Sequence, residues 1–147
     1  MVETSEFQER FKGSIEEARS QGVKPVEFEQ VTSFSTHFAE WTFKGGDLLV
    51  HLFPRSGRSD KYYPAYLDNG EYRPGRFEEK ATATFPDDMR DRIKRAADEV
   101  WLGDVAIESV PELGSYTVQF QDAATTAKVA GSKFMDKFCE AMDSELE

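Results

Sequence analysis

Residues 37–53 read HFAEWTFKGGDLLVHLF, and this stretch decides the fold. Its first part alternates along an extended strand, so that one face carries His37, Ala39, Trp41 and Phe43. The Gly45-Gly46 pair supplies a tight turn. Residues 48–53 then place apolar side chains on both faces, as a central strand that is covered from two sides requires. The stretch therefore predicts an antiparallel hairpin in the middle of a sheet.

The same turn predicts a register for the two strands. A turn centred on Gly45-Gly46 places His37 opposite a residue near position 54, and it places His51 opposite Glu40. A cross-strand pair of histidine and glutamate is either an ion pair at the edge of the core or the beginning of an acid–base site, in which the carboxylate orients the imidazole. No nucleophile is placed beside this pair, which favours the structural interpretation.

Amphipathic helices are predicted on both sides of the hairpin. The first covers residues 4–20, where apolar side chains recur at spacings of four and three. The second begins at Pro86, whose fixed φ angle suits the first turn of a helix. The third begins at Ser132 and carries a broad apolar face as far as Leu146.

The order of the elements predicts the fold class. Further strands are expected over residues 26–29, 80–85, 105–110 and 116–120. Because strands arrive consecutively, we predict an α+β fold with an antiparallel twisted sheet, covered mainly on one face by an N-terminal, a middle and a C-terminal helix. Residues 1–147 are expected to form a single globular domain, with an irregular Arg/Tyr-rich hairpin or loop region at 54–76.

Composition and motifs argue against several classes of protein. No apolar run approaches the roughly 20 residues that span a bilayer, and the first residues are acidic rather than basic and then apolar, so we expect a soluble, cytoplasmic protein. Cys139 is the single cysteine, which excludes an internal disulfide and a Cys-based zinc cage. A phosphate-binding loop ending at Gly131 fails because Thr126 occupies the position of its first glycine. The sequence predicts no cofactor, no metal and no catalytic residue.

The charge is strongly negative and unevenly distributed. The formal net charge is −10, which disfavours binding to nucleic acid or to an anionic membrane. Residues 54–85 are slightly basic, whereas both ends of the chain are acidic enough to prefer a cationic partner. Glu140, Asp143, Glu145 and Glu147 crowd the negative end of the last helix, where either the helix frays or a basic partner or a second copy docks.

The region at 54–76, called here the Arg/Tyr segment, is the best candidate for a binding site. It mixes guanidinium groups with aromatic rings, a composition that can stack on bases, hold phosphates or form a hot spot for a protein partner. The alternative is an ordinary exposed hairpin whose arginines pair with Asp60, Asp68 and Glu71. The candidate binding residues are Arg55, Arg58, Lys61, Tyr62, Tyr63, Tyr66, Tyr72, Arg73 and Arg76.

These features favour a non-enzymatic, acidic protein-interaction module, such as a chaperone, adaptor, inhibitor or immunity-type binder, that contacts a protein partner. A homodimer stays open. The alternative is a protein that binds a small ligand in a cavity between the sheet and the last helix, with an enzyme that uses His51 and Glu40 as one form of it. The order of elements and the acidity are broadly similar to those of bacterial secretion chaperones, a resemblance of architecture that no motif carries and that implies a dimeric, non-catalytic binder.

Overall fold

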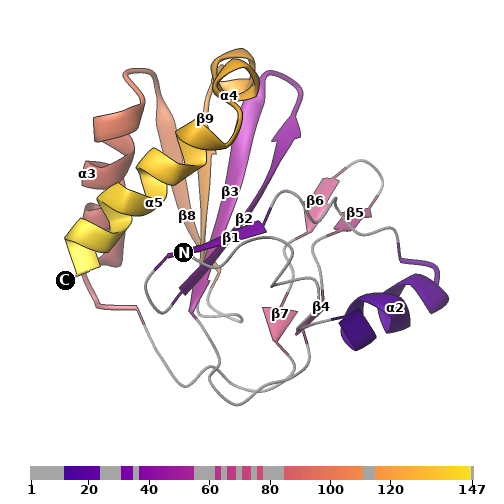
Figure 1. Ribbon diagram of the computed structural model, residues 1–147. Helices are drawn as coiled ribbons and strands as arrows, with labels where there is room; N and C mark the ends of the chain where they lie inside the picture. The colour runs from indigo at the N-terminus through magenta and orange to yellow at the C-terminus, as the bar shows by residue number, and fades with distance from the viewer. Residues whose placement is uncertain are drawn as a thin grey trace.

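The computed structural model shows a mixed α+β fold (Figure 1). The chain combines helices with an antiparallel sheet, which confirms the predicted α+β class. None of the helices in the described part of the chain is both long and apolar enough to cross a membrane. The residues that the structure describes are 12–23, 31–34, 37–54, 62–63, 66–68, 71–73, 76–77, 85–110 and 115–146.

A five-stranded antiparallel sheet forms the centre of the molecule. Its strands lie in the order β1 (Val31–Phe34), β2 (His37–Lys44), β3 (Asp47–Pro54), β9 (Ser115–Phe120) and β8 (Val105–Val110). The hairpin predicted from residues 37–53 is the β2–β3 pair. β3 lies between β2 and β9, and its residues from Leu48 to Phe53 are all buried, which confirms a central strand that is covered on both faces.

The turn of this hairpin depends on a glycine. Gly45 has a φ angle of 60°, in the left-handed region that residues with a Cβ rarely adopt. With a positive φ at Gly45 and not at Gly46, the two-residue loop has the type II′ geometry, whose twist matches the twist of the flanking strands. Lys44 and Asp47 form the pair that closes the loop, and this pair sets the register of all the other β2–β3 pairs.

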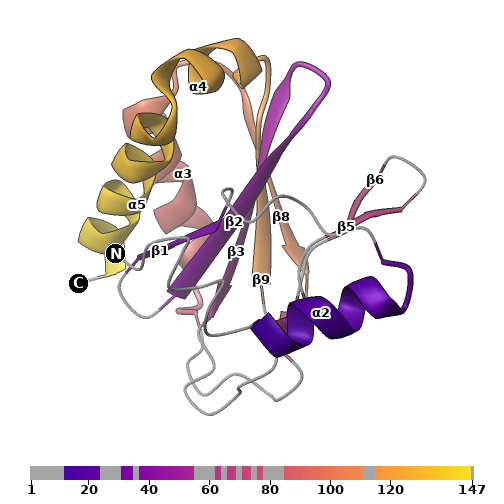
Figure 2. The same ribbon diagram turned by 45° about the vertical axis from the view of Figure 1, so that its right-hand side comes forward.

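Three helices lie on one side of the sheet: α3 (Met89–Val100), α4 (Ala124–Ala130) and α5 (Ser132–Leu146) (Figure 2). Phe120 from the sheet contacts Phe134 and Phe138 of α5 edge to face, with ring centroids 5.3 and 5.2 Å apart. The core of this layer also contains buried side chains from β2, β3 and α3, among them Ala39, Leu48, Val50, Leu52, Met89 and Ile93.

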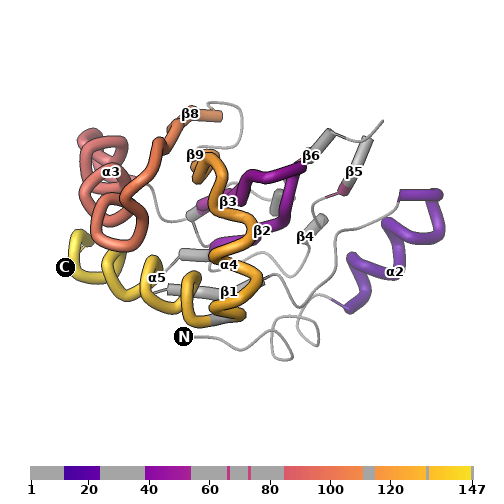
Figure 3. The backbone as a smooth tube through the Cα atoms, turned by 90° about the horizontal axis from the view of Figure 1, so that it is seen from above, coloured from indigo at the N-terminus to yellow at the C-terminus, as the bar shows by residue number. Residues whose placement is uncertain are grey.

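The N-terminal helix occupies a different place. α2 (Lys12–Ser20) lies on the opposite side of the sheet from α3 and α5 and contacts β4 (Tyr62–Tyr63) (Figure 3). Coverage of the α3 and α5 face therefore comes from the middle and C-terminal helices, together with α4, which the sequence did not predict. The predicted strand at 26–29, the strand at 80–85 except for Phe85, and the first part of the predicted helix at 4–20 lie outside the described residues.

Asp47 joins the hairpin turn to the turn between β9 and α4. Its carboxylate accepts hydrogen bonds from the Asp122 backbone N–H at 2.9 Å and from Nε2 of Gln119 at 2.6 Å. Asp122 has a φ angle of 58°, and the N–H of Ala124 donates to the carbonyl of Gly46. The Asp122 N–H, then Gln119, and the nearby Lys44 lower the pKa of Asp47, because each favours the charged carboxylate.

We expect Asp47→Asn to lower the urea midpoint near neutral pH, because the amide retains one acceptor but cannot accept from both donors. The folded pKa of Asp47 lies below its unfolded value of 3.8, so its contribution to stability is present above that pH and is lost as the pH falls through the lower folded pKa. Urea unfolding of the wild type and the variant should therefore converge at low pH.

Asp98→Asn is the matched control, since Asp98 is engaged in an exposed ion pair with Lys94 on one helix, and such pairs contribute little. A midpoint for Asp47→Asn no lower than that of Asp98→Asn would contradict the joining role of Asp47.

Candidate functional site

The Arg/Tyr segment folds as two short ribbons beside the main sheet. β4 pairs with β7 (Arg76–Phe77), and β5 (Tyr66–Asp68) pairs with β6 (Glu71–Arg73). Of the predicted binding residues, the structure places Tyr62, Tyr63, Tyr66, Tyr72, Arg73 and Arg76 in these strands. Arg55, Arg58 and Lys61 lie outside the described residues.

The registers of the ribbons set tyrosine opposite arginine in two places. Tyr66 faces Arg73 across β5 and β6, and Tyr63 faces Arg76 across β4 and β7. Residues directly opposite each other in an antiparallel pair lie on one face with their Cβ atoms about 5 Å apart, so Tyr66 and Arg73 are near enough to contact each other. Arg73 is exposed and Tyr66 is partly buried. The ribbon β5–β6 lies clear of the five-stranded sheet (Figure 2).

The predicted pairing of Glu40 with His51 is present in the sheet. Glu40 is the register partner of His51, and His37 is the partner of Pro54, as the turn predicts. Glu40 is 3% exposed and His51 is fully buried. Both lie on the face of the sheet that is turned away from the α3 and α5 layer, because their neighbours Ala39, Val50 and Leu52 alternate with them and belong to that layer.

His51 is fully buried between its register partners Glu40 and Thr117. Among the described residues neither Nδ1 nor Nε2 has a hydrogen-bond partner, and the ring stacks on Phe53 with centroids 5.4 Å apart. Burial lowers the pKa of His51 from 6.5 to about 3, because the charged imidazolium loses its hydration. His51 and Glu40 thus share a register position without a hydrogen bond to the imidazole, and His51 is a neutral, weak base near pH 7.

A second polar atom without a partner lies close by on the same face. The next position of β9 on this side after Thr117, the register partner of His51, is Ser115. Ser115 is 2% exposed, and its Oγ has no hydrogen-bond partner within the described part of the chain. Sequence reasoning missed Ser115, because one serine at the start of a strand gives no signal of burial.

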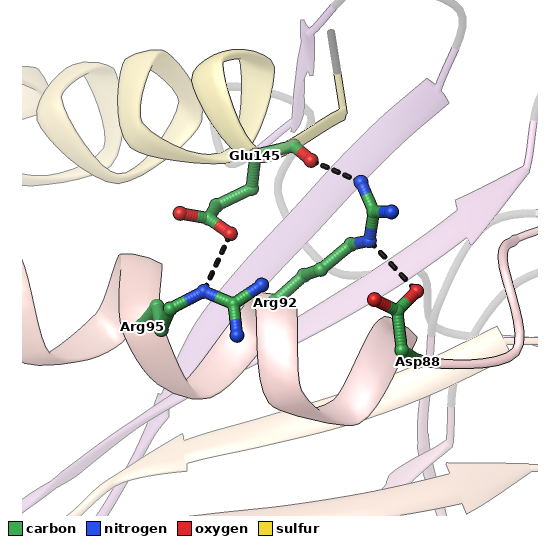
Figure 4. Close-up of polar contacts among 4 residues, drawn as sticks. All are labelled: Asp88, Arg92, Arg95 and Glu145. Carbon is green, nitrogen blue, oxygen red and sulfur yellow. Dashed lines mark hydrogen bonds and ion pairs between the residues drawn. The ribbon is translucent and has the colours of Figure 1, made fainter.

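Glu145, at the acidic end of the last helix, is engaged by two arginines of α3. Arg92 of α3 donates to the backbone carbonyl of Glu145, and Nε of Arg95 lies 2.8 Å from the Glu145 carboxylate (Figure 4). Arg92 also pairs with Asp88 at 2.8 Å. A cation at the C-terminal carbonyls of a helix opposes its dipole, so α3 supplies positive charge at the end of α5, where the sequence left open either fraying or the docking of a basic partner or a second copy.

The remaining chemistry-bearing side chains of the described residues show no assembled site. Cys139 is buried on α5, and burial raises the pKa of its thiol to about 12, which makes it a small apolar side chain rather than a nucleophile. In the described ranges, no group of three His, Cys, Asp or Glu side chains is arranged to hold a metal ion.

Comparison of the chain with models of protein families, with curated proteins and with solved structures gave no match.

We expect His51→Phe to reduce the decrease in the free energy of unfolding that accompanies mild acidification. The folded pKa of His51 lies below its unfolded value of 6.5, so the unfolded chain takes up the proton first and the wild type loses stability as the pH falls below 6.5. One such proton gives a limiting slope of about 1.4 kcal/mol per pH unit. Urea unfolding at several pH values between about 4 and about 8 measures this slope.

Thr117→Val is the control, because it changes the same row of side chains without removing a titrating group. If the curves of the wild type and His51→Phe run parallel over this range, His51 is not buried as a neutral imidazole.

Proposed function

We propose that this chain is a non-enzymatic, acidic protein-interaction module that contacts its protein partner through the Arg/Tyr segment. The observation that supports the proposal most directly is the register of β5 and β6, which sets Tyr66 opposite the exposed Arg73 on a ribbon that lies clear of the main sheet. Arginine and tyrosine are among the residues that dominate binding energy at protein interfaces.

The chemistry of the two side chains explains why such a pair suits a protein surface. The guanidinium offers five N–H donors in a planar fork, and the phenol offers an apolar ring with one polar atom. Together they recognise a carboxylate or a backbone carbonyl beside an apolar side chain. A ribbon of only three residues per strand buries little by itself, so it presents these groups at low cost to its own packing.

The acid-rich end of α5 is a weaker candidate for the contact. The carboxylate and carbonyl of Glu145 are both engaged by arginines of α3. A substitution at Glu145 would thus disturb the packing of α5 on α3 as well as any surface, and it cannot serve as a test of partner binding.

Charge reversal in the Arg/Tyr segment tests the proposal. The wild-type protein carrying a tag is used to capture material from its native lysate at moderate salt, and a stoichiometric protein partner is identified by mass spectrometry. With the purified partner, we expect Arg58→Glu combined with Arg73→Glu to weaken binding by at least about tenfold, the scale of an arginine hot spot. Calorimetric titration measures the affinity.

The matched control is Lys133→Glu combined with Lys137→Glu, which changes the net charge equally at two exposed positions of α5. Equal affinity for the two double variants would show that charge alone, and not the Arg/Tyr segment, determines binding. Capture of no stoichiometric protein partner would also count against the proposal.

The second candidate function is the binding of a small ligand, and the unpartnered polar atoms of His51 and Ser115 favour it. Nδ1, Nε2 and Oγ lie on one face of neighbouring strands, where a neutral ligand with both donors and acceptors would satisfy them. The contacts of Phe120 with Phe134 and Phe138 occupy the layer beneath α5, where the sequence interpretation located the cavity. Burial lowers the pKa of His51 to about 3, so the ring is a weak base near neutral pH, which does not favour an enzyme that uses it as a general base.

For this candidate, native mass spectrometry of protein purified from its own source should show a bound small molecule. Ser115→Ala should lower its occupancy severalfold, because a hydrogen bond to the ligand is removed. Thr126→Ala removes a hydroxyl from an exposed position of α4 and is the control. Protein that carries no molecule, or equal occupancy in both variants, would contradict ligand binding at His51 and Ser115.

A further inference from the structure

Strand β8 forms one edge of the five-stranded sheet. Among the strands of the described residues it follows β9 at the end of the order, and in the view from above it lies at the end of the sheet (Figure 3). β8 has six residues, whereas β1 at the other edge has four. The side chains of β8 are partly buried or exposed. An edge of this length presents a row of backbone donors and acceptors that can pair with another strand.

Two hydrogen bonds show which backbone groups of β8 point outward. The N–H of Gln121 donates to the carbonyl of Asp104, just before β8, so this carbonyl points toward β9. The carbonyl of Ile107 accepts from the guanidinium of Arg90, which lies on α3. Because alternate residues of an antiparallel strand direct both backbone groups to the same side, Val105, Ile107 and Ser109 direct theirs away from β9.

Arg90 covers part of this outward row. Among the described residues, the structure shows one hydrogen bond to an outward backbone group of β8, the bond from Arg90 to the Ile107 carbonyl. Arg90 is exposed, so its long side chain can leave the carbonyl without opening the core. The side chains of Val105 and Ile107 pack against the core, whereas Ser109 is exposed.

The surroundings of β8 combine an apolar anchor with negative charge. Leu102, three residues before Val105, is 102% exposed. Asp104, just before β8, and Glu108, within the strand, are both exposed. An added strand would therefore meet an exposed leucine and one carboxylate just before β8, and a second carboxylate on the strand.

We propose that the edge of β8 binds an extended, cationic segment of a protein partner by strand addition, with Arg90 leaving the Ile107 carbonyl when the segment pairs. Charge selects this occupant over a second copy of the chain. Two copies, each with a net charge of −10, would bring the carboxylates of two identical edges together. A cationic segment would instead pair its lysines or arginines with Asp104 and Glu108.

This inference rests on the proposed function only in assuming a protein partner, and it concerns a different surface from the Arg/Tyr segment. The backbone supplies affinity in strand addition, and side-chain pockets supply specificity. A proline substitution at an outward N–H can therefore remove binding without breaking the β8–β9 ladder.

The probe is a synthetic peptide of alternating lysine and valine. Titration of isotope-labelled full-length protein should shift the backbone amide signals of Val105, Ile107 and Ser109 above all. Ser109→Pro should weaken binding by about tenfold, because it removes an outward donor, while Ser109→Thr retains the N–H and should bind like the wild type. Arg90→Ala should bind severalfold more tightly, since Ile107 is then uncovered.

Peptide binding that Ser109→Pro leaves unchanged in a folded variant would overturn the inference, and so would signal shifts confined to other strands. Analytical ultracentrifugation adds a separate check of the oligomeric state. If the protein is a dimer that Ser109→Pro converts to a monomer, a second copy occupies the β8 edge, and the proposal of a cationic segment is overturned. Arg58→Glu combined with Arg73→Glu should leave peptide binding intact, so failure at β8 and failure of the Arg/Tyr segment are distinguishable.

Discussion

Strand β3 packs Leu48, Val50 and Leu52 into the layer of α3 and α5, and it buries Leu49, His51 and Phe53 on the opposite face. A strand that is buried on both faces leaves no backbone group for water, so both of its edges must be paired. β2 and β9 satisfy this requirement on either side of β3. The two-residue turn at Gly45 fixes the first pairing, and Asp47 fixes the second by holding the turn that follows β9. The positions of β8, α4 and α5 follow from these two pairings.

This dependence explains what the sequence could predict. The register of Glu40 with His51 follows from one local feature, the glycine turn, so it could be predicted without knowledge of the rest of the fold. The helices α3 and α5 carry long apolar faces and were also predictable. By contrast, α4 is a short, alanine-rich helix with a weak periodic signal, and the location of α2 opposite α3 and α5 depends on tertiary contacts that periodicity does not encode.

For the candidate sites, the sequence identified residue types better than it identified environments. It placed tyrosine and arginine together in the segment at 54–76, and the ribbons set Tyr66 opposite Arg73. It left the acids of α5 without an internal partner, although Arg92 and Arg95 are spaced by three residues on α3 and so share one face of that helix. Which helix faces which is a property of packing. The engagement of Glu145 by α3 leaves the acids on and before β8 as the better candidates for attracting a cationic partner.

His51 is a buried polar residue in a strand whose other buried residues are apolar. A leucine or phenylalanine at this position would bury comparable apolar surface without two unpartnered nitrogens, each of which costs about 1–3 kcal/mol when it is removed from water. The cost also depends on pH, because below pH 6.5 His51 binds a proton in the unfolded chain but stays neutral in the folded protein until the pH approaches about 3. Ser115 repeats the same cost on the neighbouring strand. Sequences depart from local packing rules mainly where function requires it. On the face of the sheet that carries His51 and Ser115, the burial of these polar atoms therefore lowers stability, whereas partner binding at the Arg/Tyr ribbons or the β8 edge would leave the core unchanged.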